Sequence, residues 1–334
     1  MASEGSTVSA ADAPGKTGVL RVLLIQIAVM IVTLAVIEIA LRLFNPHYLR
    51  TEDWGGLSFR HDAELGWMPL PSTTTTVMLP RVLTIRNNGL GLRDIEFQPG
   101  KPAILVLGDS QVWGYNVEDD ERFTNLMRAD LPGHTIVNAG VAGYGTDQEY
   151  LILQRLWPTI APKIVVLIFC VDNDRTDNSS NLRYFSYKPY FEAGPDGSLQ
   201  LRGQPVPKAR RVVLKESWWA RHLFLARLAI SAYVEIRYRR ITVPDPTERL
   251  IGMMRDFVQS IGARLVVGVQ YREPRLEAYL AEQNIPFTTF EGGEQFDSSK
   301  HWTPAGNRLV ADRLMTLFRE MGLVNPPQRE SSAQ

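Results

Sequence analysis

Apolar and polar residues alternate in blocks along most of this chain. Short apolar runs bounded by glycine or polar residues predict strands at residues 103–107, 135–138, 164–170, 264–269 and 285–289. Apolar residues at helical spacing predict helices at residues 119–131, 146–157, 215–239, 246–261, 274–283 and 304–321. Such alternation is typical of βαβ units, so we expect a parallel sheet covered by helices.

The longest apolar stretch lies near the start of the chain. Residues 18–44 contain an almost continuous apolar run from Val19 to Leu41. About 20 apolar residues are enough for a helix to cross a bilayer. No small-residue cleavage site follows the run, which favours a retained anchor over a removed signal peptide. We therefore expect a transmembrane helix over residues 18–44, preceded by a disordered tail over residues 1–17.

The charges that flank this run do not decide its orientation in a membrane. Lys16 and Arg21 lie at its amino-terminal end, while Arg42 and Arg50 follow its carboxyl-terminal end. The positive-inside count is therefore close to a tie. Glu38 lies one helical turn before Arg42, a spacing at which the two side chains can pair.

The rest of the chain divides by composition. Residues 45–100 are rich in Pro, Thr, Gly and Trp, and we expect a β-rich connecting collar there. Residues 101–323 hold the alternating strands and helices of the main domain, and residues 324–334 are expected to be a disordered tail. Residues 175–212 interrupt the alternation, and loops of that length are usually functional or disordered.

The predicted helix at residues 215–239 combines Trp218 and Trp219 with several arginines. An amphipathic basic helix of this composition can lie on a membrane surface. A helix packed on the sheet with solvated arginines produces the same pattern, and we favour that second interpretation.

Composition excludes some classes of protein. The 334 residues include 36 basic and 36 acidic side chains, and a formal net charge of zero argues against a nucleic-acid binder. Cys170 is the single cysteine, which excludes an internal disulfide, and its apolar surroundings predict a buried thiol. The sequence contains no cysteine pair, metal-ligand cluster or glycine-rich phosphate motif, so no cofactor or metal is implied.

Four short blocks carry the candidate chemistry. They are Gly108-Asp109-Ser110, Asn138 to Gly143, Val171 to Asp174, and His301 to Gly306. Ser110 follows a predicted strand at its carboxyl end, where open α/β sheets bind ligands. As an ordered set, the blocks resemble those of the SGNH hydrolases, the GDSL-type esterase superfamily, over about residues 100 to 320. A weaker likeness to membrane-anchored bacterial-type members is the Asn-x-x-Gly-x-Arg segment that ends at Arg93.

The resemblance implies a flavodoxin-like three-layer α/β/α domain with a parallel sheet. By the matching positions, Ser110 would be the nucleophile and His301 the base that accepts its proton. The backbone N–H groups of Ser110 and Gly143 and the amide of Asn173 would form the oxyanion hole, each contributing about 3 kcal/mol. Taken singly, each residue has an ordinary alternative as a helix cap, a turn residue or a surface histidine.

The chain departs from the family pattern at the triad acid. The family usually places an aspartate three residues before the histidine, or two in some branches, where this chain has Ser298 and Ser299. Asp297, four residues before His301, is the nearest preceding carboxylate, and we expect it to reach the imidazole. A Ser–His dyad aided by a backbone carbonyl is the alternative.

The function implied by the resemblance is a membrane-anchored, extracytoplasmic (periplasmic) serine esterase that acts on an O-acyl ester through an acyl-serine intermediate. Trp113, Tyr144 and Trp302 adjoin the blocks, and aromatic faces suit sugar rings, which favours an O-acetyl glycan as substrate. Two alternatives stay open: an O-acyltransferase acting on a polysaccharide, and a non-catalytic binding or assembly protein on the same fold.

Overall fold

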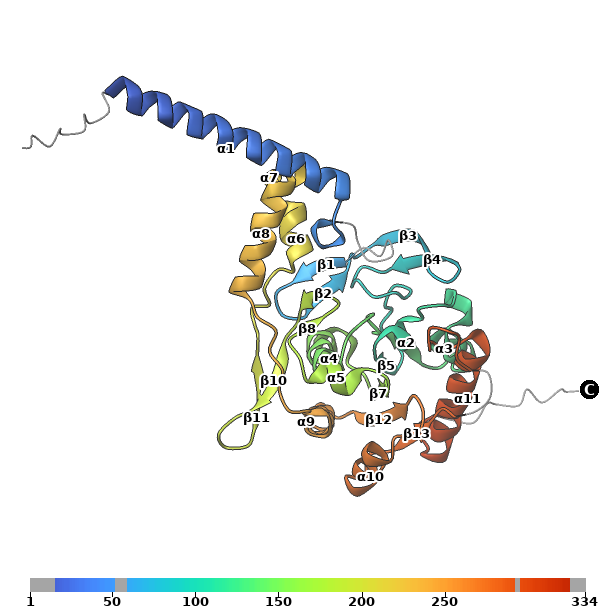
Figure 1. Cartoon of the computed structure of the whole chain (residues 1–334). Coiled ribbons are helices and arrows are strands. Elements are labelled where there is room, and N and C mark those ends of the chain that lie inside the picture. The colour runs from blue at the N-terminus through green and yellow to red at the C-terminus, as the bar shows by residue number, and fades with distance from the viewer. Residues whose placement is uncertain (1–15, 52–58, 292–294, 325–334) are drawn as a thin grey trace, which may run out of the picture.

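The computed structural model describes residues 16–51, 59–291 and 295–324, and its centre is a five-stranded parallel sheet (Figure 1). The strands are β5 (Ala103–Leu107), β6 (Thr135–Asn138), β7 (Ile164–Phe169), β12 (Arg264–Val269) and β13 (Phe287–Thr289). Their order across the sheet is β13-β12-β7-β5-β6. Counted along the chain this is 2-1-3-4-5, the flavodoxin-like order, so the predicted sheet is confirmed.

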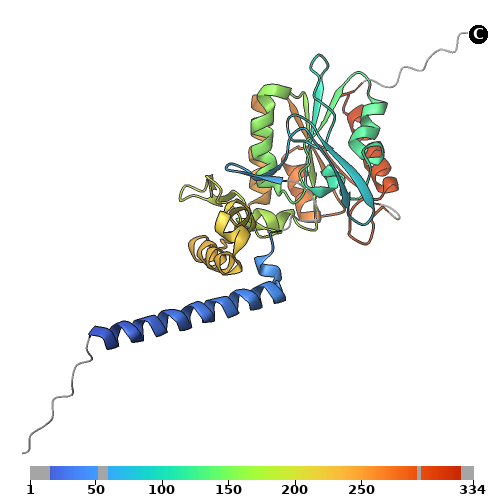
Figure 2. The same cartoon turned by 90° about the horizontal axis from the view of Figure 1, so that it is seen from above.

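Helices cover both faces of the sheet (Figures 1 and 2). One face carries α4 (Thr146–Ile160), α9 (Thr247–Ser260) and α10 (Pro274–Glu282), and the other carries α3 (Phe123–Asp130) and α11 (Pro304–Glu320). Strand β5 supplies both cores: Leu105 and Leu107 pack into the first, whereas Ile104 and Val106 pack into the second. The strand is wholly buried because helices cover it on both sides. The predicted three-layer architecture is confirmed.

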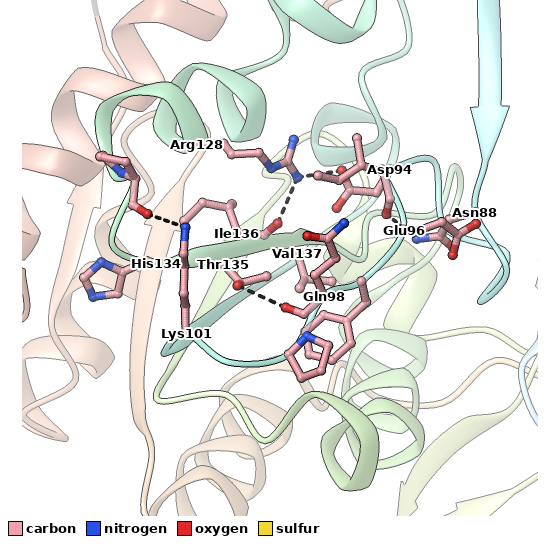
Figure 3. A pocket seen from close by; sticks show the side chains of 14 residues that line it. Asn88, Asp94, Glu96, Gln98, Lys101, Arg128, His134, Thr135, Ile136 and Val137 are labelled. Atoms are coloured by element: carbon pink, nitrogen blue, oxygen red, sulfur yellow. Dashed lines mark hydrogen bonds and ion pairs between the residues drawn. The ribbon is translucent and has the colours of Figure 1, made fainter.

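The edge of the sheet at β6 is closed by side chains (Figure 3). The guanidinium of Arg128 donates to the carbonyl oxygen of Ile136 at 2.8 Å, and the carboxylate of Asp94 accepts from the backbone N–H of Asn138 at 2.8 Å. Arg128 and Asp94 also pair with each other at 2.6 Å. These two outward backbone groups of β6 are therefore satisfied within the chain.

Small hairpins surround the carboxyl side of the sheet. After the short turn η1 (His47–Leu49), they are β1 (Phe59–Asp62) with β2 (Gly66–Pro69), β3 (Thr73–Met78) with β4 (Val82–Asn87), β8 (Leu182–Arg183) with β9 (Ser186–Tyr187), and β10 (Tyr190–Ala193) with β11 (Leu199–Arg202). The short helices α2 (Ser110–Trp113), η3 (Asp119–Glu121) and α5 (Asp174–Asn178) complete this side. The segment 175–212, predicted as a loop, is thus largely ordered into α5 and two hairpins.

The single helix predicted over residues 215–239 is wrong, because three helices occupy the region. They are α6 (Arg210–Glu216), α7 (Trp218–His222) and α8 (Phe224–Arg237). The first break is at Ser217, whose hydroxyl caps α7 by accepting from the N–H of Ala220 at 3.3 Å. The second is at Leu223, which is extended (φ −127°, ψ 124°). The apolar spacing runs through both breaks, so periodicity alone does not reveal them.

The apolar stretch near the start forms one long helix, α1 (Lys16–Phe44), which projects away from the sheet domain (Figures 1 and 2). It is long and apolar enough to cross a membrane, and its most apolar part is not buried by the protein. Its carboxyl-terminal end packs against α8. The tails predicted at residues 1–17 and 324–334 fall almost wholly outside the described residues.

Candidate active site

The fold brings together the serine and the histidine predicted from the sequence. Ser110 begins α2 directly after β5, and His301 lies in the loop before α11. The Oγ of Ser110 is 2.7 Å from the Nε2 of His301, within hydrogen-bond distance. The imidazole also stacks on the ring of Tyr115, with 4.4 Å between the ring centroids. This packing holds the imidazole against the serine hydroxyl.

The protonation state of His301 follows from its surroundings. Burial lowers the pKa of His301 below its usual value of 6.5, while the carboxylates of Asp109, Asp297 and Asp172 act in the opposite direction. The imidazole is therefore mainly neutral at pH 7. A neutral imidazole can accept a proton from the hydroxyl that it contacts.

Two buried residues fix the short helix that presents Ser110. Asp109 caps α2, because its carboxylate accepts from the backbone N–H of Gln111 at 2.8 Å. Arg93, the last residue of the Asn-x-x-Gly-x-Arg segment, is fully buried. Its guanidinium donates to carbonyl oxygens at the end of α2 and just beyond it, those of Trp113, Gly114 and Val117. Arg93 thus supports the short helix that presents Ser110.

The second ring nitrogen of His301 contacts a serine and not a carboxylate. The Nδ1 of His301 is 2.9 Å from the Oγ of Ser299. The Ser299 hydroxyl lies 2.6 Å from the Oδ1 of Asp297, and the amide of Asn116 donates to Ser299 and to Asp297. Since Ser299 gives its proton to Asp297, its oxygen accepts from the Nδ1–H of His301. The Nε2 lone pair is then left facing Ser110.

The structure differs from the predicted direct contact between Asp297 and the imidazole. A tight turn over residues 297–300 bends the carboxylate back, and Lys300 takes a left-handed conformation there (φ 63°). Oδ1 of Asp297 accepts from the backbone N–H groups of Ser299 at 2.7 Å and His301 at 3.2 Å. Asp297 therefore reaches the ring only through Ser299. Whether Asp297 serves as the triad acid stays a prediction, now in this indirect form.

Two of the three predicted oxyanion donors have unused N–H groups. Within the described part of the chain, neither the backbone N–H of Ser110 nor that of Gly143 donates to another protein group. Gly143 has a positive φ of 81°, and a Cβ there would lie 2.7 Å from the ring of Tyr184. Only glycine fits this turn without strain.

The loop that carries Gly143 is held against α2. The side-chain amide of Asn138 donates to the carbonyl oxygen of Val112 at 2.7 Å and its oxygen accepts from the N–H of Gly140 at 3.0 Å. A Cβ on Gly140 would lie 2.4 Å from the backbone nitrogen of Trp113. The residues from Asn138 to Gly143 thus hold this loop close to α2, the helix that begins with Ser110.

Asn173, the third predicted donor, follows β7 and precedes α5. Because β7 neighbours β5 in the parallel sheet, Asn173 and Ser110 follow adjacent strand ends, at the switch point where this fold binds ligands. The amide nitrogen of Asn173 donates to the carboxylate of Asp177 at 2.8 Å. One of its two hydrogens is used by this bond, and the other remains as a donor.

A cluster of buried carboxyl groups lies behind the site, and sequence reasoning missed it. Asp147 pairs with the fully buried Lys188. Burial and neighbouring carboxylates raise the pKa values of Glu149 and Asp174 well above their usual range, which favours their protonated forms. Burial raises the pKa of Asp177 to about 6. Among the described residues, no group of three or more His, Cys, Asp or Glu side chains is placed to hold a metal ion.

The three aromatic residues predicted to line a sugar site do not do so. Trp113 is 1% exposed, Tyr144 is 0% exposed and Trp302 is 2% exposed, so all three belong to the core. Their positions beside the motif residues reflect packing under the loops. The prediction that these three rings are available to stack on a sugar is therefore wrong.

A different aromatic residue covers the candidate oxyanion loop. Tyr184 and Phe185 form the two-residue turn between β8 and β9, and both have positive φ, 49° and 59°. Non-glycine residues in this conformation cost about 1 kcal/mol or more each. The ring of Tyr184 lies against Gly143, and its hydroxyl accepts from Arg183 at 2.8 Å. A strained turn thus places the ring of Tyr184 against the loop that carries Gly143.

A cavity of about 240 Å³ lies elsewhere, beside the edge strand β6 (Figure 3). Polar groups that line the cavity form hydrogen bonds within the protein. Lys101 donates to the carbonyl oxygen of Pro132 at 2.7 Å, and Thr135 donates to that of Gln98 at 3.4 Å. None of its lining residues contacts Ser110 or His301. We assign it no role in the candidate chemistry.

No protein-family model and no curated protein matches the chain. Solved structures similar to it include a psychrotrophic esterase EstA from Pseudoalteromonas sp. inhibited by monoethylphosphonate, with 10% identity, 67% of this chain and 100% of that chain covered, and a TM-score of 0.39. An acetyl xylan esterase, AlAXEase, has 14% identity, coverages of 64% and 98%, and a TM-score of 0.38. A member of the lipolytic G-D-S-L family from Veillonella parvula has 15% identity, coverages of 65% and 98%, and a TM-score of 0.37. At these values, function is inferred from the site itself.

Proposed function

We propose that this chain is a serine esterase that hydrolyses O-acyl esters through an acyl-serine intermediate. The observation that carries the proposal is the 2.7 Å contact between Ser110 Oγ and His301 Nε2. It joins a hydroxyl at the switch point of the sheet to a neutral imidazole whose other nitrogen is already bonded to Ser299. A non-catalytic protein on the same fold has no need of this arrangement.

The proposed reaction has two halves. His301 accepts the hydroxyl proton while Ser110 Oγ attacks the ester carbonyl carbon, and the oxyanion forms beside the N–H groups of Ser110 and Gly143 and the amide of Asn173. The carbon–oxygen bond to the alcohol breaks, and His301 gives that oxygen the proton. Water then attacks the acyl-serine with His301 again as base, which releases the acid and restores Ser110.

We propose an O-acyl ester as the substrate and specify neither its acyl group nor its alcohol. The buried Trp113, Tyr144 and Trp302 leave the glycan without support from aromatic stacking. The acyl-serine is common to hydrolysis and to transfer onto a sugar hydroxyl, and the products formed with and without a glycan acceptor distinguish the two.

A fluorophosphonate probe tests the proposed function directly. We expect covalent modification of the full chain at Ser110, because the probe captures a hydroxyl activated by a neighbouring base. Mass spectrometry of the tryptic peptides locates the adduct. His301→Ala should lose the labelling and Ser298→Ala, in the same loop as Ser299, should keep it. An unlabelled native chain would exclude the acyl-serine mechanism.

The rate of ester hydrolysis should fall in acid. The base must be neutral to accept a proton, and burial lowers the pKa of His301 below 6.5. We expect kcat/KM to be at its plateau at pH 7 and to fall tenfold per pH unit below the pKa of His301. A profile from about pH 4 to 9 measures this. Asp177, whose pKa is about 6, titrates in the same range, and Asp177→Asn separates its contribution. An acid limb centred above pH 6.5 would contradict the assignment.

We further propose that α1 is a retained single-pass anchor and that the catalytic domain lies outside the cytoplasm. Contacts with the domain support retention: Glu38 and Arg42 of α1 both bond to backbone groups where α7 meets α8. A cleaved signal peptide would leave those groups without their partners. The orientation is supported by the resemblance to anchored members of the esterase superfamily.

Reporter fusions after Gln334 test this topology. We expect a reporter that works only outside the cytoplasm to be active there and a cytoplasm-only reporter to be silent. The fusion should also keep its full length and remain in the membrane fraction. Activity of the cytoplasm-only reporter would show the opposite orientation, and a shortened soluble chain would show cleavage.

A further inference from the structure

Helices α7 and α8 expose large apolar side chains beside α1. Trp218 and Trp219 of α7 are 55% and 63% exposed, and Tyr233 and Ile236 of α8 are 62% and 75% exposed. Isolated exposed apolar residues are ordinary, but a contiguous group marks an interaction surface. We call these two helices, with their exposed apolar side chains, the α7–α8 surface.

Four apolar residues of α8 share one helix face. Leu225, Leu228, Ala232 and Ile236 recur at spacings of three and four residues, and each is half-buried or exposed. The opposite face packs inward, where Val234 is 2% exposed and contacts the hairpin β8–β9. The outer side of the helix therefore carries apolar residues as well, flanked by the exposed Glu235 and Arg237.

The start of α8 is hydrogen-bonded to α1 at Glu38. The carboxylate of Glu38 accepts from the N–H of Phe224 at 3.0 Å and from that of Leu225 at 2.8 Å, which caps α8. Glu38 is the first charged residue after the uncharged run Val22 to Ile37. In a helix that crosses a bilayer, the surface lies where the uncharged run ends. If α1 crosses a bilayer, the start of α8 is therefore near the bilayer surface.

Figures 1 and 2 show where this surface lies. The yellow helices lie beside the carboxyl-terminal part of α1, and α8 runs across the direction of α1 (Figure 1). The sheet lies beyond the end of α1, away from its amino terminus (Figure 2). If α1 stands across the bilayer, α8 therefore lies along the bilayer surface. Tryptophans at such a level are typical of the aromatic belts of membrane proteins.

The basic residues near these apolar side chains fit a lipid surface, and the exposed carboxylate of Glu235 on α8 pairs with Arg210 at 3.0 Å. Arg221 on α7 and Arg237 on α8 are exposed, and neither pairs with a carboxylate in the part of the chain that the structure describes. Interfacial helices bury an apolar face at the boundary of headgroups and acyl chains and place arginines against anionic headgroups.

We propose that the α7–α8 surface docks into the headgroup region of an anionic bilayer. Trp218, Trp219 and the outer face of α8 enter the acyl boundary, while Arg221 and Arg237 contact lipid phosphates. The proposal rests on α1 being the anchor. Continuity with α1 through Glu38 selects the bilayer over a second copy of the chain or another protein as the occupant.

The test uses the full chain, reconstituted in vesicles of phosphatidylcholine and phosphatidylglycerol at less than one chain per vesicle. Ile236→Cys places an environment-sensitive fluorophore on the outer face of α8, and Glu320→Cys, exposed at the end of α11, is the matched control. Cys170 is buried, and the chain without an added cysteine gives the background. We expect a blue shift and quenching by brominated acyl chains at position 236 and water-like emission at position 320.

Intrinsic fluorescence gives a second readout without a label. Brominated lipid should quench the native chain, and the double variant Trp218→Phe, Trp219→Phe should lose that quenching. Trp157→Phe, on α4, should keep it. Removing phosphatidylglycerol should weaken the quenching, and Arg221→Gln should weaken it to a similar degree in mixed vesicles.

Flotation of the vesicles distinguishes the two possible failures. A chain that does not float overturns the anchor and the docking together. A chain that floats but has water-like emission at position 236 overturns the docking alone. A blue shift that appears only at several chains per vesicle, without quenching by brominated lipid, would assign the surface to a second copy and overturn the bilayer as its occupant.

Discussion

Ser110→Ala is expected to abolish ester hydrolysis. The substitution removes the hydroxyl that we propose forms the acyl-enzyme, and the loss of a serine nucleophile lowers kcat by roughly six powers of ten. The fold should survive, because within the described residues the Oγ of Ser110 hydrogen-bonds only to His301 and, at 3.4 Å, to the capping carboxylate of Asp109. Steady-state hydrolysis of a chromogenic acetate ester by the purified full chain measures the effect.

The matched control is Ser298→Ala, which removes a hydroxyl from an exposed position three residues before His301. Its activity should equal that of the native chain, and its thermal unfolding midpoint and that of Ser110→Ala should both be unchanged within about one degree. Native-like hydrolysis by Ser110→Ala, free of contaminating esterase, would place the chemistry elsewhere in the molecule.

Ser299→Ala and Asp297→Asn form the second test, with large but unequal effects. Ser299 accepts the Nδ1–H of His301, so its loss frees the imidazole to rotate and to take the wrong tautomer. We expect kcat to fall by about two to three powers of ten with little change in KM. Asp297 acts through Ser299, so Asp297→Asn, which keeps an acceptor oxygen, should cost about one to two powers of ten.

The double variant reveals whether the two residues act as one chain of hydrogen bonds. If Asp297 works only by holding Ser299, Ser299→Ala with Asp297→Asn should be no slower than Ser299→Ala alone. Asp297→Asn should also move the acid limb of the pH profile to lower pH, because the carboxylate raises the pKa of His301. Fully additive losses, or an unmoved acid limb, would assign Asp297 a role only in shaping the loop.

The fold could be predicted from the sequence because its strands are buried on both faces. Runs such as residues 103–107 and 164–170 have no polar face, and they alternate with amphipathic helices, which leaves few topologies open. The pairing of Ser110 with His301 required more than periodicity. The two lie far apart in the chain, and only the ordered set of blocks in the resemblance connected them.

The contact made by Ser299 could not be predicted, because it depends on the conformation of a four-residue turn. A carboxylate four residues before a histidine is close enough in sequence to contact its imidazole. In the structure, however, the backbone N–H groups of Ser299 and His301 compete for the oxygen of Asp297. Those N–H groups are donors at fixed short distances, so they bind the carboxylate ahead of the ring. Sequence spacing carries no information on that competition.

Burial was the other property that the sequence did not reveal. Trp113 and Trp302 lie beside motif residues, but the loop direction that turns the motif toward solvent turns these rings into the core. Glu149 looks like an ordinary acidic residue in the first turn of a helix, where charge is favoured by the dipole. The raised pKa of Glu149 follows from its burial and from neighbouring carboxylates such as Asp109, which are distant in sequence.

The satisfied backbone groups at the edge of β6 bear on whether copies of this chain aggregate. An unpaired strand edge is a template on which a second chain can add a strand, and the hazard rises when chains are crowded into a thin layer. Here Asp94 and Arg128 bind two of the backbone groups that such an addition would need. The opposite edge strand, β13, has only three residues. Both margins of the sheet are therefore poor templates for the addition of a strand from a neighbouring chain.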